Sequence, residues 1–334
     1  MGTFILKKDL TAIEKLGIGR FWQNYLVHFC GLNEDKNIFF EMRVMKKKKI
    51  IELNEEGCIK EEYKKRFAIR CMFLMNVIST FQDYEYLYYI QELPRGGFFY
   101  YYLRSSKKFT KEVSKFYFGE MVLGIQYLHS KGMFFRLLSP DNIMITLDGH
   151  IKLRFDFLNS IGMPFSEYEK NIEYIPIDYV RNKEFSIESD YWSLGIILFE
   201  MMVGSTPFAA KSYEKVVFKM LNDTINYPSF IDEETKDLLI RLLDKYKFRR
   251  IGHNYNDRYL IRTHQFFNGI NWISLSQKKI RPPITIKVDP LADKKNGKKV
   301  SEMFTTDFKK GQTDGYGPMF RYYGTTIDKK IYKW

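Results

Sequence analysis

The clearest hydrophobic pattern of the chain lies over Thr110–Lys131. Apolar residues recur there at the three- and four-residue spacing of a helix that buries one face, and the segment is followed by Gly132, a residue type that often ends helices. The spacing predicts one long helix. Further helices are expected around Ala210–Leu221, Asp232–Asp244 and Asp257–Phe267.

Segments with a strand-like composition precede this helix. Asn76–Asp83 and Tyr86–Leu93 are rich in β-branched and aromatic residues and predict two strands. Hydrophobic residues make up 45% of the 334 residues, which is enough for a sizeable core and for more than one average domain. No apolar run reaches membrane-spanning length, because the best one, Leu194–Val203, is interrupted by Glu200.

The net charge of +13, from 53 basic and 40 acidic residues, widens the set of partners to consider. A basic chain attracts nucleic acid, anionic lipid or acidic protein segments. The positive charge is scattered, however, with only short runs such as Lys46–Lys49 and Lys294–Lys299. The chain has no RNA-recognition motif, zinc-ligand spacing or helix-turn-helix signal. Nucleic acid is therefore the weaker expectation, and a protein partner, within a larger assembly, is the stronger one.

The three cysteines, Cys30, Cys58 and Cys71, form no Cys-x-x-Cys pair and are odd in number. This usage favours a reducing compartment over a disulfide-linked secreted protein. We therefore expect a cytoplasmic protein, and we leave open an association with the cytoskeleton or with a large complex.

Candidate chemistry comes from Phe135–Asn142, which reads FRLLSPDN. It fits, without a gap, the H-R-D-L-x-x-x-N pattern of the catalytic loop of eukaryotic protein kinases. Glu173–Asp178 similarly resembles the family's E-Y-x-A-P-E, and Asp190–Gly195 matches D-x-W-S-L-G. His264–Pro283 carries phrases typical of the AGC subgroup, which includes the cyclic-nucleotide-dependent kinases. From roughly Leu10 to Tyr323, the chain thus resembles an AGC protein kinase catalytic domain.

The resemblance implies an α+β fold with two lobes. The expected parts are a small β-rich N-lobe over residues 1–92, a larger helical C-lobe over 93–278 and an AGC-type C-terminal tail over 279–334. Within the N-lobe, Ile38–Met45 takes the place of the strand with the phosphate-binding lysine, and Asn54–Met75 that of the regulatory helix. In the tail, the polar, lysine-rich segment Asp289–Lys310 is predicted to be mobile.

Compared with that family, the catalytic loop lacks its base. Leu137 stands at the position of the catalytic aspartate and has no lone pair with which to accept or orient a hydroxyl proton. Ser139 replaces a lysine, whereas Asn142 keeps a magnesium-ligand position. In the D-F-G region, the ungapped alignment puts Phe155 at the magnesium-binding aspartate. A one-residue bulge would give that position to Asp156 instead; we favour the ungapped alignment and leave both open.

The nucleotide-binding positions are altered as well. In the glycine-rich loop, Gly17 and Gly19 keep the first two glycine positions, but Trp22 occupies the third, where backbone amides normally approach the phosphates. Arg43 replaces the phosphate-binding lysine, and Glu41 replaces a small residue beside the adenine. Two further nucleotide contacts are lost, at Asn24 and Phe98. We expect neither a nucleotide cofactor nor a bound metal.

Residues that support the family's fold are retained. Glu62 is the expected ion-pair partner of Arg43, with Glu61 as the alternative, and Asp178 is expected to pair with Arg250. The remaining positions with an expected structural role are the catalytic-loop Arg136, the loop-bracing Asp190, and Phe320 and Tyr323 of the hydrophobic motif by which AGC tails dock.

Together these changes predict a pseudokinase, a catalytically inactive kinase-like protein that acts as a scaffold or as a structural or regulatory interaction module. Two alternatives stay open. One is an active Ser/Thr protein kinase with unorthodox catalytic residues, in which Asp141 or Asp156 serves as base or metal ligand. The other is a basic protein that binds nucleic acid or an anionic surface, for which a steep loss of binding with salt would be diagnostic.

Overall fold

The computed structural model describes residues 5, 7–18, 22–29, 38–155, 171–253, 259–286, 298–303 and 317–320. Contacts divide the chain into two compact units. The small unit comprises Met1–Arg70, Met75–Leu93 and Pro290–Trp334, and the large unit comprises Cys71–Leu74 and Pro94–Asp289. The C-terminal part of the chain therefore belongs to the same unit as the N-terminal part.

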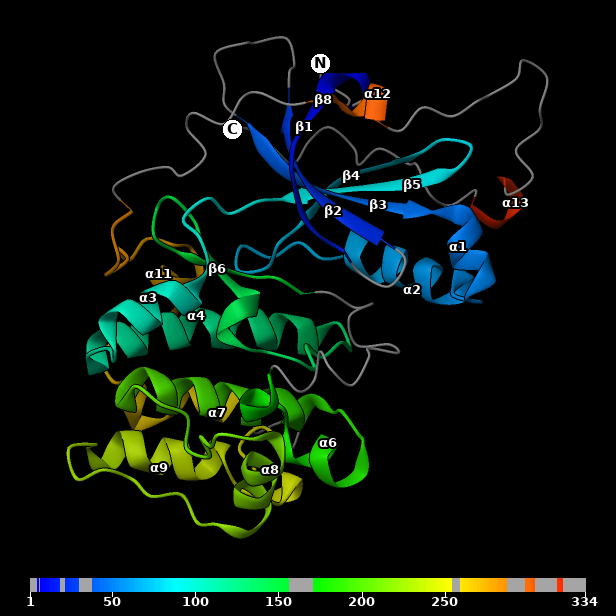
Figure 1. Cartoon of the computed structure of the whole chain (residues 1–334). Coiled ribbons are helices and arrows are strands. Elements are labelled where there is room, and N and C mark those ends of the chain that lie inside the picture. The colour runs from blue at the N-terminus through cyan, green and yellow to red at the C-terminus, as the bar shows by residue number, and fades with distance from the viewer. Residues whose placement is uncertain are drawn as a thin grey trace. The chain divides into compact units, whose positions relative to one another are not determined.

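The small unit is built on a six-stranded sheet with the order β4-β5-β3-β2-β1-β8 (Figure 1). Its five main strands are antiparallel to their neighbours: β1 (Leu10–Ile18), β2 (Trp22–Phe29), β3 (Phe39–Lys46), β4 (Val77–Gln82) and β5 (Tyr86–Glu92). The two predicted strands are confirmed as β4 and β5. One face of the sheet carries an apolar core that includes Val27, Met42, Val44, Tyr88 and Ile90. Because side chains alternate along a strand, the intervening residues lie on the opposite face.

Two helices follow β3, namely α1 (Lys47–Glu52) and α2 (Glu56–Phe67). The second lies inside Asn54–Met75, where the regulatory helix was expected. Three short elements complete the described part of this unit: η1 (Lys7–Asp9), α12 (Val300–Met303) and α13 (Gly317–Phe320).

Part of the C-terminal tail forms regular structure on the sheet. Lys298–Lys299 form β8, which pairs antiparallel with Thr11 and Ala12 of β1. Val300, which follows directly, is completely buried in the apolar core. An open sheet edge offers unpaired backbone groups, so a short segment with one apolar anchor is enough to add a strand. The prediction that Asp289–Lys310 is mobile is therefore wrong for residues 298–303, and the rest of that segment lies outside the described residues.

The large unit is helical and is organised around α7 (Ile187–Val203), of which nearly every residue is buried. Its neighbours α4 (Lys111–Ser130) and α9 (Glu233–Leu242) pack against it (Figure 1). The other elements among its described residues are α3 (Phe99–Ser106), η2 (Pro140–Asn142), β6 (Ile143–Ile145), β7 (Ile151–Leu153), η4 (Ile172–Tyr174), α6 (Ile177–Asn182), α8 (Tyr213–Asn222), η5 (Lys247–Arg249), α10 (Leu260–Thr263), η7 (Gln265–Phe267) and α11 (Trp272–Ser276). The side chains of Thr110, Ser212 and Asp232 cap α4, α8 and α9 by accepting backbone hydrogen bonds.

Three of the predicted helices are confirmed as α4, α8 and α9. The helix predicted over Asp257–Phe267 is wrong as a single element, because α10 ends at Thr263 and the backbone of the next residue, His264, is extended. His264 Nδ1 accepts a hydrogen bond from the Phe266 backbone N–H at 3.1 Å and so starts the separate turn η7. Among the described residues, no helix is both long and apolar enough to cross a membrane. The α+β class is confirmed.

Candidate functional site

Arg43, at the position expected for a phosphate-binding lysine, belongs to a buried charged group on the sheet face opposite the apolar core. It lies on β3 between Asn24 of β2 and Tyr89 of β5. Its Nη1 is 3.5 Å from Glu62 Oε1, and its Nε donates to Asn24 Oδ1 at 3.3 Å. The guanidinium carbon is 4.9 Å from the centre of the Trp22 ring. With only 2% of Arg43 exposed, its guanidinium is held by partners within its own unit.

A second arginine, Arg66, enters the same group from α2. Its Nη1 lies 3.6 Å from the same Glu62 oxygen, and its Nη2 donates to Gln91 Oε1 at 2.7 Å. Its guanidinium carbon is 5.1 Å from the Tyr89 ring centre, and the residue is 2% exposed. One carboxylate is thus shared by two buried arginines. Arg66 was not predicted from the sequence, because α2 itself carries charged residues on all sides. Its pattern of apolar and charged residues therefore does not show which face is buried.

Other altered nucleotide-site positions lie on the same sheet face. Glu41 is 1% exposed and precedes Arg43 by two residues on β3, opposite Gln91 of β5. In the retained part of the glycine-rich loop, a Cβ added at Gly17 would meet nothing within 4 Å. Packing therefore does not require glycine at that position. Gly19 lies outside the described residues.

In the large unit, Asp190 braces the segment that resembles a catalytic loop. Its buried carboxylate accepts hydrogen bonds from the backbone N–H groups of Phe135 at 2.7 Å and Arg136 at 2.8 Å. It also lies 2.8 Å from His129 Nε2. Arg136 has a φ of 75°, a conformation that residues other than glycine rarely adopt. The two hydrogen bonds hold this strained backbone, so the loop has a defined shape.

Leu137, at the place of the catalytic base, is half-buried and adds no polar side chain to the loop. Its carbonyl accepts a hydrogen bond from Asn142 Nδ2 at 2.8 Å, and the same amide lies 3.4 Å from Ser139 Oγ. Ser139 itself is buried. The amide of Asn142 therefore stabilises the loop from within.

The alignment of the D-F-G region can be followed only in part. Phe155 is 2% exposed, and its ring centre lies 5.7 Å from that of Phe135. Asp156 lies outside the described residues, so the two alignments stay open. In the part of the chain that the structure describes, no three or more His, Cys, Asp or Glu side chains form a group able to hold a metal.

Asp178 and Arg250 form a buried, two-pronged ion pair in the large unit. Arg250 Nη1 and Nη2 donate to the two carboxylate oxygens at 2.7 and 3.3 Å. The same guanidinium donates to the carbonyls of Glu188 and Asp244, at 2.8 and 3.0 Å. The pair therefore ties α6 to the start of α7 and to the segment after α9.

Phe320 of the hydrophobic motif is completely buried in the small unit. Its carbonyl accepts a hydrogen bond from Gln82 Nε2 at 3.0 Å, and Lys47 Nζ lies 5.8 Å from its ring centre. Figure 1 shows α13, which ends at Phe320, beside α1, which begins at Lys47. The tail therefore docks on its own chain at this point. Tyr323 lies outside the described residues.

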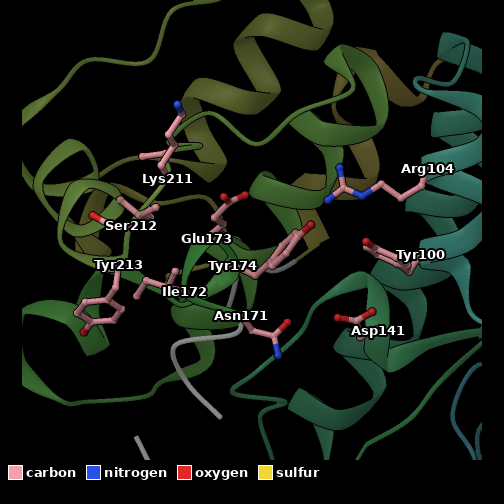
Figure 2. Close-up of a pocket in the computed structure, with 12 residues that line it drawn as sticks. Tyr100, Arg104, Asp141, Asn171, Ile172, Glu173, Tyr174, Lys211, Ser212 and Tyr213 are labelled. Carbon is pink, nitrogen blue, oxygen red and sulfur yellow. The ribbon is translucent and has the colours of Figure 1, made fainter. Parts of the chain in front are cut away.

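A pocket of about 560 Å³ opens in the large unit (Figure 2). Tyr100 and Arg104 of α3 line it together with Asp141 and Tyr174. Glu200, which is 1% exposed, contacts two of these residues: it accepts a hydrogen bond from the Tyr174 hydroxyl at 2.7 Å and lies 3.2 Å from Arg104 Nη2. Burial raises the pKa of Glu200, although these two neighbours oppose the shift. The pocket lining therefore combines acidic, basic and aromatic groups, and Asp141 is the one of these residues that the sequence marked as a candidate base or metal ligand.

The chain is similar to known proteins over most of its length. The family model described as Protein kinase domain matches residues 10–267. The chain is 30% identical over 290 residues to the cAMP-dependent protein kinase catalytic subunit PRKX of Homo sapiens, which covers 86% of this chain and 80% of that protein. It is also 30% identical over 295 residues to Protein kinase C delta type of Mus musculus, a match that covers 86% of this chain and 42% of that protein. The cAMP-dependent protein kinase catalytic subunit of Dictyostelium discoideum is 30% identical over 290 residues, and the match covers 86% of this chain and 44% of that protein.

The chain thus spans less than half the length of the last two relatives and four fifths of the first. All three relatives are AGC kinases, in agreement with the resemblance found in the sequence. With its small sheet-based unit, its larger helical unit and these matches, the chain belongs to the protein kinase family.

Proposed function

We propose that this member of the protein kinase family is a pseudokinase, which does not transfer phosphate and instead acts as a scaffold or regulatory interaction module for other proteins. The relatives are named as kinases, so the proposal concerns a loss within the family. Phosphoryl transfer depends almost entirely on positioning and on charge, and both require particular side chains.

The observation that carries the proposal is the loop Phe135–Asn142. Asp190 holds its backbone, but the side chain at the base position is that of Leu137, which cannot accept a proton. The amide of Asn142, at a magnesium-ligand position, is hydrogen-bonded to the loop itself. A loop that keeps a defined shape without its base supports a structural role.

The small unit supports the same proposal. A lysine ammonium on a flexible stem reaches a phosphate readily, whereas the planar guanidinium of Arg43 is engaged by Glu62, Asn24 and Trp22. Glu41 adds a second buried carboxylate on that sheet face, at the position that the resemblance assigns to a small residue beside the adenine, and a bulky carboxylate there disfavours a bound base. We infer that the protein does not bind magnesium-ATP.

Two measurements on the full chain test the proposal. In the first, wild type and Leu137→Asp are incubated with radiolabelled magnesium-ATP and a basic peptide, beside an active relative. Neither is expected to transfer phosphate, because catalytic groups act as a unit and restoring one does not restore the rest. The second compares the unfolding of the protein with and without magnesium-ATP. Specific binding of ATP at a hundredfold excess over Kd would raise the free energy of unfolding by about 2.7 kcal/mol, and we expect no such increase. Transfer by the wild type in proportion to its concentration would refute the proposal.

One feature favours the alternative of an active kinase with unorthodox residues. Asp141 is exposed and lines the large-unit pocket, where a carboxylate could meet a substrate. If phosphate transfer is observed, Asp141→Asn decides the point: activity lost with unchanged thermal stability assigns the base to Asp141.

For location and partners, we propose a cytosolic protein held within a large complex or on the cytoskeleton. Cys58 and Cys71 are free thiols, which suits a reducing compartment. Cell fractionation tests the location, and affinity purification with protein identification names the partner. Recovery in a secreted fraction would contradict this proposal.

A further inference from the structure

Two exposed stretches of the large unit meet to form one surface. Residues 181–184 close α6, residues 246–249 span η5, and all eight are exposed. Arg181 Nη1 donates to the Lys245 carbonyl at 2.7 Å, and Lys247 Nζ lies 3.5 Å from Glu184 Oε2. These contacts join the stretches, and we call residues 181–184 and 246–249 together the basic–aromatic surface.

Arginines and aromatic rings alternate on this surface. Tyr246 and Phe248 are 51% and 60% exposed, and the centres of their rings are 5.7 Å apart. The guanidinium carbon of Arg249 lies 5.1 Å from the first ring and 5.9 Å from the second, and that of Arg181 lies 5.8 Å from the Tyr246 ring. An arginine stacked on a ring keeps its N–H edge available for acceptors, and stacking limits its motion. The surface therefore presents oriented hydrogen-bond donors.

The surface has an excess of positive charge. Of its four cations, Lys247 is paired with Glu184, the surface's one carboxylate. Within the described parts of the chain, Arg181, Lys183 and Arg249 have no ion-pair partner. Below them, Lys245 donates to the carbonyls of Leu221 and Asp223 at 3.1 and 2.7 Å, and burial together with the nearby Arg181 charge lowers its pKa. An anionic ligand is the complement of this surface.

A pocket of about 440 Å³ adjoins the surface and shares Phe248 and Arg249 with it. Leu260, which is 51% exposed, and Ile251 add apolar walls. The charged Arg241 in the lining is already paired with Asp237 at 2.9 Å. Arg250 in the lining is likewise paired with Asp178, whereas Arg249 is left for an acidic group of a ligand. Phe248, Ile251 and Leu260 offer contact to an apolar side chain beside it.

We propose that the basic–aromatic surface binds an acidic segment of a partner protein, with carboxylates on Arg181 and Arg249 and one large apolar side chain in the adjoining pocket. This inference gives the chemistry of a partner for the proposed interaction function, but it does not depend on loss of catalysis. A protein segment fits better than nucleic acid for two reasons. Three available cations are few for a nucleic-acid site, which commonly contacts about 6–10 phosphates. The arginines also cover ring faces on which bases would stack.

The test is fluorescence polarisation with the full chain and a labelled synthetic peptide of glutamates around one tryptophan, without nucleotide. We expect saturable binding that weakens with salt, that fails when lysines replace the glutamates, and that weakens when serine replaces the tryptophan. Arg181→Gln combined with Arg249→Glu is expected to weaken binding at least about tenfold, and Phe248→Ala roughly fivefold. Lys131→Gln combined with Lys215→Glu, at exposed lysines outside the surface, is the charge-matched control and is expected to retain binding within about twofold.

Circular dichroism and the unfolding midpoint show that each variant is folded. The three positions changed on the surface, Arg181, Phe248 and Arg249, are all exposed. Phe248→Ala tests the surface without a change of charge. No binding of the peptide by the wild type, or equal losses in the surface and control variants, would overturn the inference. Tighter binding of a thymidine oligonucleotide, abolished by the same surface variants, would overturn it in favour of nucleic acid. None of these results changes the outcome of the phosphate-transfer assay, so the two proposals fail separately.

Discussion

Glu62→Gln is expected to destabilise the small unit strongly, because it removes the one carboxylate shared by Arg43 and Arg66. The change keeps the side-chain volume and an acceptor oxygen, so it alters mainly the charge. In the wild type, the two arginine Nη1 atoms lie 3.5 and 3.6 Å from the same oxygen, and both arginines are 2% exposed. Removing one partner of a buried pair typically costs about 3–5 kcal/mol. With two arginines on one acid, we expect a value in that range, or roughly 10 °C in Tm.

The neighbouring Glu61 supplies a matched control. It is exposed, and Lys64 and Lys65 lie 3.8 Å from its oxygens. Such exposed pairs contribute little, so Glu61→Gln should change the free energy of unfolding by less than about 0.5 kcal/mol. Thermal and denaturant unfolding give the stability of both variants, and hydrogen exchange of the α2 amides shows whether the loss of stability lies at α2. Equal stability of the two variants would show that the buried group is not what holds α2 to the sheet.

Three further outcomes are expected. Phe320→Ala should destabilise the small unit by about 3 kcal/mol and expose the tail to limited proteolysis, whereas Met319→Ala, at a residue that is 51% exposed, should do neither. Burial alone would raise the pKa of Asp232, but hydrogen bonds from Lys111 and Thr235 hold that pKa at about 2. Its contribution to stability is therefore complete above its unfolded pKa of roughly 4 and is lost as pH falls towards 2. In urea unfolding, Asp232→Asn should accordingly have a lower free energy of unfolding than the wild type at pH 6, and this difference should vanish near pH 2. Asp190→Ala should cost at least about 3 kcal/mol, seen as lower Tm and yield, because two backbone N–H groups lose their buried acceptor.

The helical framework of the large unit follows directly from the sequence. α4 has apolar residues at regular spacing and a capping threonine, so its span differs from the predicted one by a residue at each end. The Asp178–Arg250 contact could be anticipated because both residues sit in recognisable family phrases, although 72 positions apart. Local patterns and family phrases therefore give the elements and some of their connections.

The contacts that are specific to this chain could not be predicted from local patterns or from family phrases. Arg66 has the same local surroundings as the exposed Lys64 and the half-buried Lys65, and only the position of α2 on the sheet decides that Arg66 is buried. The strand β8 consists of two lysines, which have no strand preference, and exists because β1 offers an open edge. The break at His264 depends on one side chain accepting a backbone N–H. In each case a tertiary contact overrides the local sequence pattern.

The pairing of Thr11 with Lys299 sets an order for the folding of the chain during synthesis. When Lys299 leaves the ribosome, every residue of the large unit has already been made, since that unit ends at Asp289. Until then the outer edge of β1 has no partner strand and can pair with other chains. Closing this contact brings together residues of very large sequence separation, which makes the step slow. The nascent small unit therefore passes through a stage in which its sheet edge is open, and this is the stage at which we expect a chaperone to be needed.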